Sequence, residues 1–384
     1  MGQSEHDLPA FLLDQWLDQT RNADPKIEYD LGSSTGPVWT LRELLALDGG
    51  KVNEALLDTE LLYTGATGSQ ELRGAIAAMY GVDPDNVQVV TGASEALLML
   101  FFFASEPAAN VVIPNPGLPS NDAMAKALNV ETRYYTLRAE DGFRIDLGEI
   151  RRLVDRNTRF VLINSPHNPT GAVVSDTEME TLHDFCADRG VQLVSDEVYH
   201  PIYHGLQVQS AARLAHATVL GDFSKALCLS GLRVGWMVER DSKRRARYTN
   251  ARSYFTVSNT VLGERLATLA LQNRDAIYAR GRLVASANLA LLDNFFDEYS
   301  DIVRWVRPPG GMTAFPWLRD GADAREFCLR LIKRGVLLTP GDCFGMPGHF
   351  RLGFAASGDR FPRGLELLSD FLRTEVRGRA SAIA

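Results

Sequence analysis

The sequence lacks most of the features that mark secreted, membrane or nucleic-acid-binding proteins. It has only four cysteines in 384 residues, without CxxC spacing, which predicts reduced thiols and a cytoplasmic protein. Residues 1–10 do not form a signal-peptide pattern, and the most apolar run, residues 96–104, is about half of the roughly 20 residues that a membrane span needs. A net charge of −8 disfavours a nucleic-acid-binding surface. We therefore expect no membrane or nucleic-acid partner.

Internal repeats, low-complexity segments and metal-binding patterns are also missing. His200 and His204 have the i, i+4 spacing of two ligands on a helix, but no third ligand pattern accompanies them, so we expect no metal site. With 45% hydrophobic and 23% charged residues, the composition is that of an ordinary globular protein. Its length favours two or three domains.

Short apolar segments alternate with longer helix-like ones, which indicates α/β architecture around a largely parallel sheet. We expect strands at 86–91, 111–113, 159–164, 191–195 and 234–239, and helices at 94–105 and 177–189. After about residue 275 the pattern changes to one long helix, 280–299, followed by short strands and turns. The prediction is a large domain of residues 46–275 and a smaller α+β domain made of 1–45 and 276–384.

Lys225 stands in the most informative string of the chain, GDFSKALCLSGLRVGW at residues 221–236. It follows a short apolar run, and Arg233 comes eight positions later in a turn bracketed by glycines. A desolvated lysine amine can lose its proton and form a Schiff base with a carbonyl, and an arginine offers a fixed fork of donors to a phosphate. An exposed surface lysine is the alternative that the residue alone leaves open.

This string resembles the cofactor-lysine segment of the class I/II (fold type I) aminotransferases, which bind pyridoxal phosphate. The resemblance implies a Schiff base between the cofactor and Lys225, with Ser224 and Arg233 at the phosphate. A second string, NSPHNPTG at residues 164–171, is similar to the NPTG loop of the family. It implies that Asn168 donates to the phenolate oxygen of the cofactor and also faces the substrate.

Two further strand ends complete the cofactor motifs. Asp196 ends a predicted strand, and the resemblance implies that its carboxylate pairs with the pyridinium nitrogen, while Tyr199 also bonds the phenolate oxygen. At residues 91–96 a glycine turn leads into a helix, where Ser94 is a candidate N-cap. In the family this position is the phosphate cradle, which makes Ala93 and Ser94 phosphate-site candidates.

Other matches concern the substrate and the subunit arrangement. Arg351 lies in a strand resembling the one whose arginine binds the substrate α-carboxylate, and Gly32 falls where an N-terminal segment covers the substrate. Tyr63 resembles a tyrosine that reaches the phosphate of the neighbouring subunit, which implies a homodimer. A core or interface tyrosine without cofactor contact is the alternative.

Two positions depart from the family pattern. Leu118 stands where an aromatic residue usually stacks on the cofactor ring. Asp222 stands three positions before Lys225, where many members have a phosphate-binding serine. Because a carboxylate repels a phosphate, we expect Asp222 to point away and Ser224 or Arg233 to carry more of the contact.

The resemblance covers roughly residues 30–360 and implies an aminotransferase that acts on an L-amino acid and a 2-oxo acid. The fold it implies is a mostly parallel sheet of the seven-stranded type, flanked by helices. Segments around Trp16, residues 31–36 and residues 309–316 also resemble the capreomycidine synthases, which use the same cofactor to cyclise a hydroxylated arginine. A lyase, such a cyclase and a non-catalytic regulator therefore stay open as alternatives, although no helix-turn-helix region precedes the family-like part.

Overall fold

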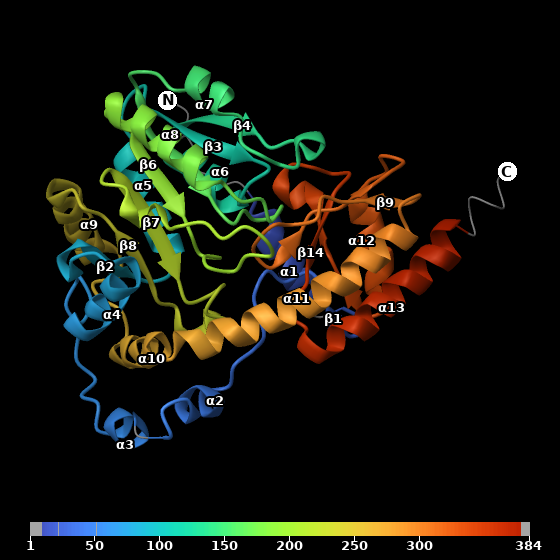
Figure 1. Ribbon diagram of the computed structural model, residues 1–384, viewed down its shortest axis with the longest axis horizontal. Helices are drawn as coiled ribbons and strands as arrows, with labels where there is room; N and C mark the ends of the chain where they lie inside the picture. The colour runs from blue at the N-terminus through green and yellow to red at the C-terminus, as the bar shows by residue number, and fades with distance from the viewer. Residues whose placement is uncertain (1–9, 22, 51, 378–384) are drawn as a thin grey trace, which may run out of the picture.

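The computed structural model describes residues 10–21, 23–50 and 52–377, and a seven-stranded sheet forms its centre (Figure 1). The strand order is β2-β8-β7-β6-β5-β3-β4. The strands are β2 (Val87–Val90), β3 (Asn110–Asn115), β4 (Glu131–Thr136), β5 (Thr158–Asn164), β6 (Gln192–Asp196), β7 (Ala217–Asp222) and β8 (Gly235–Val238). Only β8 runs antiparallel to its neighbours within this sheet. The predicted α/β class with a largely parallel sheet is confirmed.

Both faces of the sheet are buried, which is why its strands read as continuous apolar runs rather than as alternating patterns. In β6, Leu193 packs into one core cluster and the adjacent Val194 into the other. The same alternation divides Val219 and Leu220 of β7 between the two clusters. Consecutive side chains point to opposite faces of a strand, so each strand supplies both cores.

Helices cover the two faces of the sheet. The apolar segment near residue 100 forms α5 (Ala93–Ala104), which packs on β2, β7 and β8, and α8 (Asp176–Asp188) packs on β6. The remaining helices of this part are α4 (Gln70–Tyr80), α6 (Pro119–Ala127), α7 (Leu147–Leu153), α9 (Ser242–Phe255) and α10 (Val261–Gln272). The predicted helices at 94–105 and 177–189 therefore exist, with ends shifted by one or two residues.

The edge strand β4 was not predicted from the sequence. Its residues, ETRYYT, are mostly polar or partly exposed, and only Tyr135 among them is buried. A strand without an apolar run gives no clear periodic signal. It became visible only through its parallel pairing with β3.

The C-terminal part is joined to the sheet by the 25-residue helix α11 (Arg274–Glu298), which runs between the two regions in Figure 1. It contains α12 (Ala324–Ile332), α13 (Phe361–Phe371) and the short strands β9 (Val303–Arg304), β10 (Thr313–Ala314), β11 (Trp317–Leu318), β12 (Val336–Leu337), β13 (Thr339–Pro340) and β14 (Phe350–Gly353). This region explains why the periodicity of the sequence changes after residue 275.

The N-terminal segment packs on this C-terminal part. It comprises α1 (Leu12–Arg21) and β1 (Tyr29–Asp30), and β1 pairs in parallel with β12. In α1 the Trp16 indole donates to the carbonyl of Leu338 at 3.0 Å. The sequence-based boundaries at residues 45 and 275 stay a prediction.

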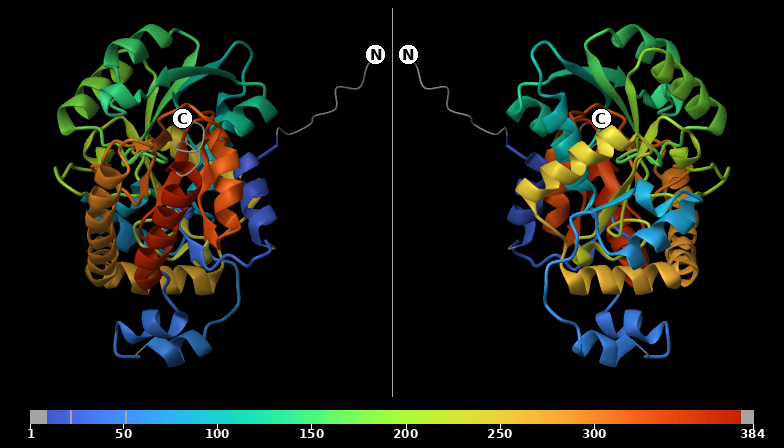
Figure 2. Two further views of the ribbon diagram at one scale, coloured as in Figure 1. Left: turned by 90° about the vertical axis from the view of Figure 1, so that its right-hand side faces the viewer. Right: turned by 90° about the vertical axis from the view of Figure 1, so that its left-hand side faces the viewer.

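Two short helices, α2 (Leu41–Ala46) and α3 (Val52–Leu57), project from the body of the molecule in both views of Figure 2. The extended residues after α3 expose large apolar side chains, among them Leu61, Leu62 and Tyr63. Within the described part of the chain, no helix has the length and apolar character required to cross a membrane.

Candidate cofactor and substrate site

A cavity of about 360 Å³ lies at the carboxyl ends of β6 and β7, where open α/β sheets place their ligands. It brings together most of the residues predicted from separate strings of the sequence. Its lining includes Ala93, Ser94, Leu118, Asn168, Asp196, Tyr199, Ser224, Lys225, Arg233 and Arg351. Ala93 of α5 and Arg351 of β14 thus line one cavity although they are far apart in the sequence.

Lys225 follows β7 directly, and its amine reaches the Ser34 hydroxyl at 3.0 Å. Burial lowers the pKa of Lys225 to about 8, while Asp222 acts in the opposite direction and the charge of Arg351 lowers it further. A lysine with this pKa holds a substantial fraction of neutral amine near neutral pH. The neutral amine is the form that attacks a carbonyl.

Asp196 ends β6 with a carboxylate that is 6% exposed and accepts one hydrogen bond, from the Val198 N–H at 3.2 Å. Burial raises the pKa of Asp196 to about 7, with the Val198 N–H opposing this shift and the charge of Asp222 adding to it. A buried carboxylate in this condition lacks a cationic partner. The protonated ring nitrogen of pyridoxal phosphate would supply that partner.

Asn168 and Tyr199 also line the cavity. The Tyr199 hydroxyl donates to the Ser34 carbonyl at 2.9 Å. The Asn168 Oδ1 accepts from the Arg351 Nη1 at 3.3 Å. Because the oxygen of this amide faces Arg351, its nitrogen is the end that can donate to the cofactor. Their bonds to the phenolate oxygen stay a prediction.

Arg351 in β14 is 2% exposed, and its guanidinium lies over the Phe344 ring at 5.1 Å and donates to neutral oxygen atoms. It donates to the Gly32 carbonyl from Nε at 3.2 Å and from Nη2 at 2.9 Å, and to Asn168 and Thr339. Burial lowers the pKa of Arg351 without bringing it near neutrality. A substrate carboxylate would neutralise this buried cation, and the Gly32 segment holds it in place.

The amino end of α5 forms the phosphate cradle. Its N-cap is Gly92, at φ 73°, which has no side chain of its own to cap the helix. The sequence-based expectation that Ser94 caps α5 is therefore wrong, because the helix begins one residue earlier and Ser94 lies in its first turn. Uncapped N–H groups at a helix start favour an anion. The φ of 73° at Gly92 lies in the left-handed region, so this position favours glycine.

Asp222 does not point away from this cradle, contrary to our expectation. It lines the cavity, is 8% exposed, and accepts a hydrogen bond from the Ser224 N–H at 2.8 Å. Burial raises the pKa of Asp222, and the charge of Lys225 and the N–H groups of Ser224 and Ala93 oppose this shift. Since a carboxylate at the end of β7 finds its donors at the cradle, it turns inward.

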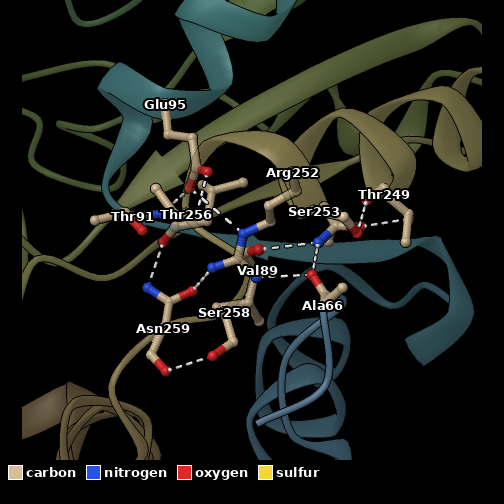
Figure 3. A network of polar contacts seen from close by, with 12 residues as sticks. Ala66, Val89, Thr91, Glu95, Thr249, Arg252, Ser253, Thr256, Ser258 and Asn259 are labelled. Carbon is tan, nitrogen blue, oxygen red and sulfur yellow. Dashed lines mark hydrogen bonds and ion pairs between the residues drawn. The ribbon is translucent and has the colours of Figure 1, made fainter. Parts of the chain in front are cut away.

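A buried polar network supports the cradle from behind (Figure 3). Arg252 of α9 pairs with Glu95 of α5, donates to the Ala66 carbonyl at 2.7 Å and contacts Asn259. Glu95 also accepts from the Thr91 N–H at 2.5 Å, and Asn259 donates to the carbonyl of Val90 at 3.0 Å. The network therefore joins the strand end before α5 to the helix that follows β8.

The remaining predicted residues differ in their positions. Leu118 lines the cavity and precedes α6, consistent with its expected place near the ring. Tyr63 is 85% exposed and does not line the cavity. Ser34, whose hydroxyl meets Lys225, was missed as a site residue, although the hydroxyl run Ser33-Ser34-Thr35 could have suggested it. Leu13, Asp14 and Leu17 of α1 also reach the cavity without any sequence signal.

The donor set fits pyridoxal phosphate. Uncapped N–H groups and Arg233 suit its phosphate, the unpaired Asp196 suits its ring nitrogen, and Lys225 suits its aldehyde. One feature opposes the phosphate, namely the Asp222 carboxylate beside the cradle. The cavity volume falls within the range of cofactor sites, about 300–1,000 Å³.

Comparison with known proteins also points to a pyridoxal-phosphate enzyme. The sequence model of the family described as aminotransferase class I and II matches residues 31–360. The chain is 33% identical to capreomycidine synthase of Streptomyces vinaceus, covering 99% of this chain and 98% of that protein. It is 30% identical to the aspartate/prephenate aminotransferase of Thermus thermophilus, covering 85% and 86% of the two chains.

Solved structures show the same relationship. A pyridoxal-phosphate-dependent aminotransferase from Streptococcus suis superposes with a TM-score of 0.89 at 31% identity, covering 96% of this chain and 98% of the other. The pyridoxal-phosphate-dependent cyclase OrfR superposes with a TM-score of 0.88 at 30% identity, covering 98% and 100%. The family match includes all the strand ends at the cavity, and the chain belongs to the class I and II aminotransferases, with pyridoxal phosphate as its cofactor.

Proposed function

We propose that the protein is an aminotransferase that moves the amino group of an L-amino acid to a 2-oxo acid. The observation that carries this proposal is the buried, unpaired guanidinium of Arg351, which shares one cavity with Lys225. Both substrates of a transamination carry an α-carboxylate, and Arg351 can bind each of them in turn. When bound, the cofactor supplies the electron sink for the bonds at the α-carbon.

The residues of the chain divide the work as follows. Arg351 holds the carboxylate and so fixes the orientation of the α-carbon in the cavity. Lys225, with its pKa near 8, can take the α-proton as a base and return it as an acid. Ser34 lies within hydrogen-bond distance of the Lys225 amine and can hold it between these transfers. The Asp196 carboxylate keeps the ring nitrogen protonated.

A capreomycidine synthase-like cyclase or a lyase is the second candidate. It is favoured by the similarity to capreomycidine synthase, which extends over nearly the whole length of both chains. The cavity also has an acidic residue at its mouth, Asp14 of α1, on the side of the substrate. A carboxylate there suits a cationic substrate side chain such as a guanidinium. In this reaction the same α-proton transfer would be followed by loss of a β-substituent and ring closure.

Mixing the purified protein with single amino acids separates the two candidates. An aminotransferase converts its cofactor once to pyridoxamine phosphate and then stops until a 2-oxo acid is added. A lyase or cyclase releases product continuously from the amino acid alone, with the lysine-bound cofactor spectrum retained. Substrates should include arginine, β-hydroxyarginine, aspartate and aromatic amino acids, with Lys225→Ala as the inactive control. Continuous turnover without any 2-oxo acid would overturn the aminotransferase proposal.

We also propose a homodimer in which Tyr63 contacts the phosphate of the neighbouring subunit. This is supported by the exposed apolar side chains around Tyr63, among them Leu57, Leu61 and Leu62, each at least 69% exposed in the single chain. Such a surface is typical of an interaction site. Light scattering of the purified protein should give twice the 42.4 kDa of the chain, and Tyr63→Phe should weaken cofactor binding. A monomeric holoenzyme would contradict this arrangement.

A further inference from the structure

Asp222 lies where the cradle is most crowded. It is the last residue of β7 and pairs with Gly235, the first residue of β8. A Cβ at Gly235 would stand 2.7 Å from the Gly92 carbonyl carbon and 2.8 Å from the Ala93 nitrogen. The end of β7, the start of β8 and the first turn of α5 are therefore in direct contact. A carboxylate on β7 at this point competes with the phosphate for the same N–H groups.

Few charges can neutralise Asp222 in this position. The elements packed around it bring Lys225 from the turn after β7, Asp196 from the end of β6 and Arg233 from the turn before β8. Of these, the charge of Lys225 opposes the rise in the Asp222 pKa. Asp196 carries the same charge as Asp222, and the charge of Asp222 raises the Asp196 pKa. The acid on α5, Glu95, is engaged by Arg252 on the other side of the helix.

Lys225 and Arg233 are the two cations near Asp222, and the cofactor phosphate brings about two negative charges to the same place. Arg233 contacts the Ser224 hydroxyl at 3.5 Å and the Ser230 carbonyl at 3.2 Å, and it is the natural ligand of the phosphate. The cradle would then hold two anions, carboxylate and phosphate, side by side. Two neighbouring groups of like charge raise each other's pKa, so they do not both stay fully ionised.

We propose that Asp222 and the cofactor phosphate share one proton, so that the cofactor is taken up together with a proton from solvent. The proton lies between a carboxylate oxygen of Asp222 and a phosphate oxygen. It turns a repulsive pair into a short charge-assisted hydrogen bond. No bond to carbon or phosphorus forms or breaks, and the complex carries one charge less than its separated parts. The affinity for the phosphate group therefore falls as the pH rises.

This assignment rests on the cofactor of the family and is independent of the proposed reaction. Two features of the molecule make the proton uptake favourable. Burial of Asp222 already raises its pKa before any phosphate arrives. A phosphate monoester has a second pKa of about 6, so at neutral pH it lies close to its own protonation. The serine found at this position in many family members would need no proton.

Binding of pyridoxamine phosphate to the full-length apo protein tests the proposal, because this ligand forms no bond with Lys225. Its dissociation constant is measured by isothermal titration from pH 6 to 9, for the wild type and for Asp222→Ser and Asp222→Asn. We expect the wild-type dissociation constant to rise by about tenfold per pH unit above pH 7. Both variants should show a flatter profile and bind roughly tenfold tighter than the wild type at pH 8.5.

Three controls complete the experiment. Pyridoxamine without phosphate should bind the wild type and the variants with the same pH profile. Asp188→Asn removes an exposed carboxylate at the end of α8 that does not line the cavity, and should keep the wild-type slope. Titration in buffers of different ionisation enthalpy should show about one more proton taken up by the wild type than by Asp222→Asn.

Two results would overturn the proposal. Equal pH slopes in the wild type and both variants would mean that Asp222 and the phosphate do not share a proton. Weaker binding by Asp222→Asn at every pH, with an unchanged thermal melt, would show that the carboxylate serves only as an acceptor for backbone N–H groups. Because the asparagine variant keeps an oxygen that can accept from the Ser224 N–H, it guards against a loss of folding in the serine variant.

Discussion

Two arginines of this protein are almost completely buried, yet their surroundings differ. Arg252, with 0% exposure, pairs with Glu95 and is held by Ala66 and Asn259 (Figure 3). Arg351, with 2% exposure, lies over the Phe344 ring and donates its hydrogen bonds to neutral oxygen atoms of Gly32, Asn168 and Thr339. Removing a cation from water is costly unless an anion compensates for it.

The difference separates a structural charge from a functional one. The Arg252 pair is complete within the chain and joins α5 to α9. The positive charge of the Arg351 guanidinium is neutralised only when an anion from outside the chain enters the cavity. Burial by itself does not distinguish the two residues, whereas the presence or absence of an internal carboxylate does.

The largest expected effect is on stability, at Arg252. Arg252→Met leaves the Glu95 carboxylate buried without its cation, and we expect the free energy of unfolding to fall by about 3–5 kcal/mol. Urea unfolding followed by tryptophan fluorescence measures the loss. The double variant Glu95→Gln with Arg252→Met should recover part of it. A loss below about 1 kcal/mol is typical of weak surface ion pairs and would contradict a structural role for the Arg252 charge.

The next effect is on reactivity, at Arg351. Arg351→Gln removes the charged partner of the substrate carboxylate, worth about 2–5 kcal/mol, so kcat/KM for the amino acid should fall by about thirtyfold or more. The rate at which an amino acid consumes the lysine-bound cofactor spectrum measures it. Stability should change little, since no internal ion pair is broken. The exposed Arg363→Gln is the matched control, and an Arg351→Gln enzyme as fast as wild type would contradict the assignment.

A smaller effect concerns ligand stabilisation. A dicarboxylate without an amino group, such as maleate, should occupy Arg351 and stabilise the protein by about 2.7 kcal/mol at a hundred times its dissociation constant. Thermal melts should show the same increase for the wild type and for Arg252→Met, but none for Arg351→Gln. An equal increase in all three proteins would mean that the ligand binds elsewhere.

The smallest effect is a pH shift at Lys225. Its pKa is lowered to about 8 by burial, and the Arg351 charge contributes to the lowering, whereas Arg252 does not. Below this pH the rate at which the apo protein captures pyridoxal phosphate should fall by about tenfold per unit. Loss of a nearby positive charge favours the protonated amine, so Arg351→Gln should move the midpoint upward by a fraction of a unit. Arg252→Met should leave it in place, and a shift in both variants would argue against a local cause.

Much of the site could be predicted because each cofactor motif is a contiguous string at a strand end. Asn168, Asp196 and Lys225 each follow a buried strand, and parallel strands bring their carboxyl ends to one edge of the sheet. The strands themselves were predictable where both faces are buried. The polar edge strand β4 was not, because its pairing with β3 supplies what its composition does not indicate.

The wrong expectations concern orientation. Ser94 was expected to cap α5, but the helix begins at Ala93 and leaves its N–H groups uncapped. Asp222 was expected to avoid the phosphate site, from the repulsion between two anions alone. The close contact of Gly235 with Gly92 and Ala93 brings backbone donors to the end of β7, and the Asp222 carboxylate turns toward them.

The sequence by itself determined the cofactor and the α/β class and predicted the lysine that binds the cofactor, because these depend on local strings and on the burial pattern of single strands. Only the tertiary structure decided what stands beside them. Ser34 meets the Lys225 amine across 191 residues of sequence, and Arg351 meets Asn168 across 183. Contacts of this kind depend on how the N-terminal and C-terminal segments pack over the sheet, and on where a buried charge finds its partner.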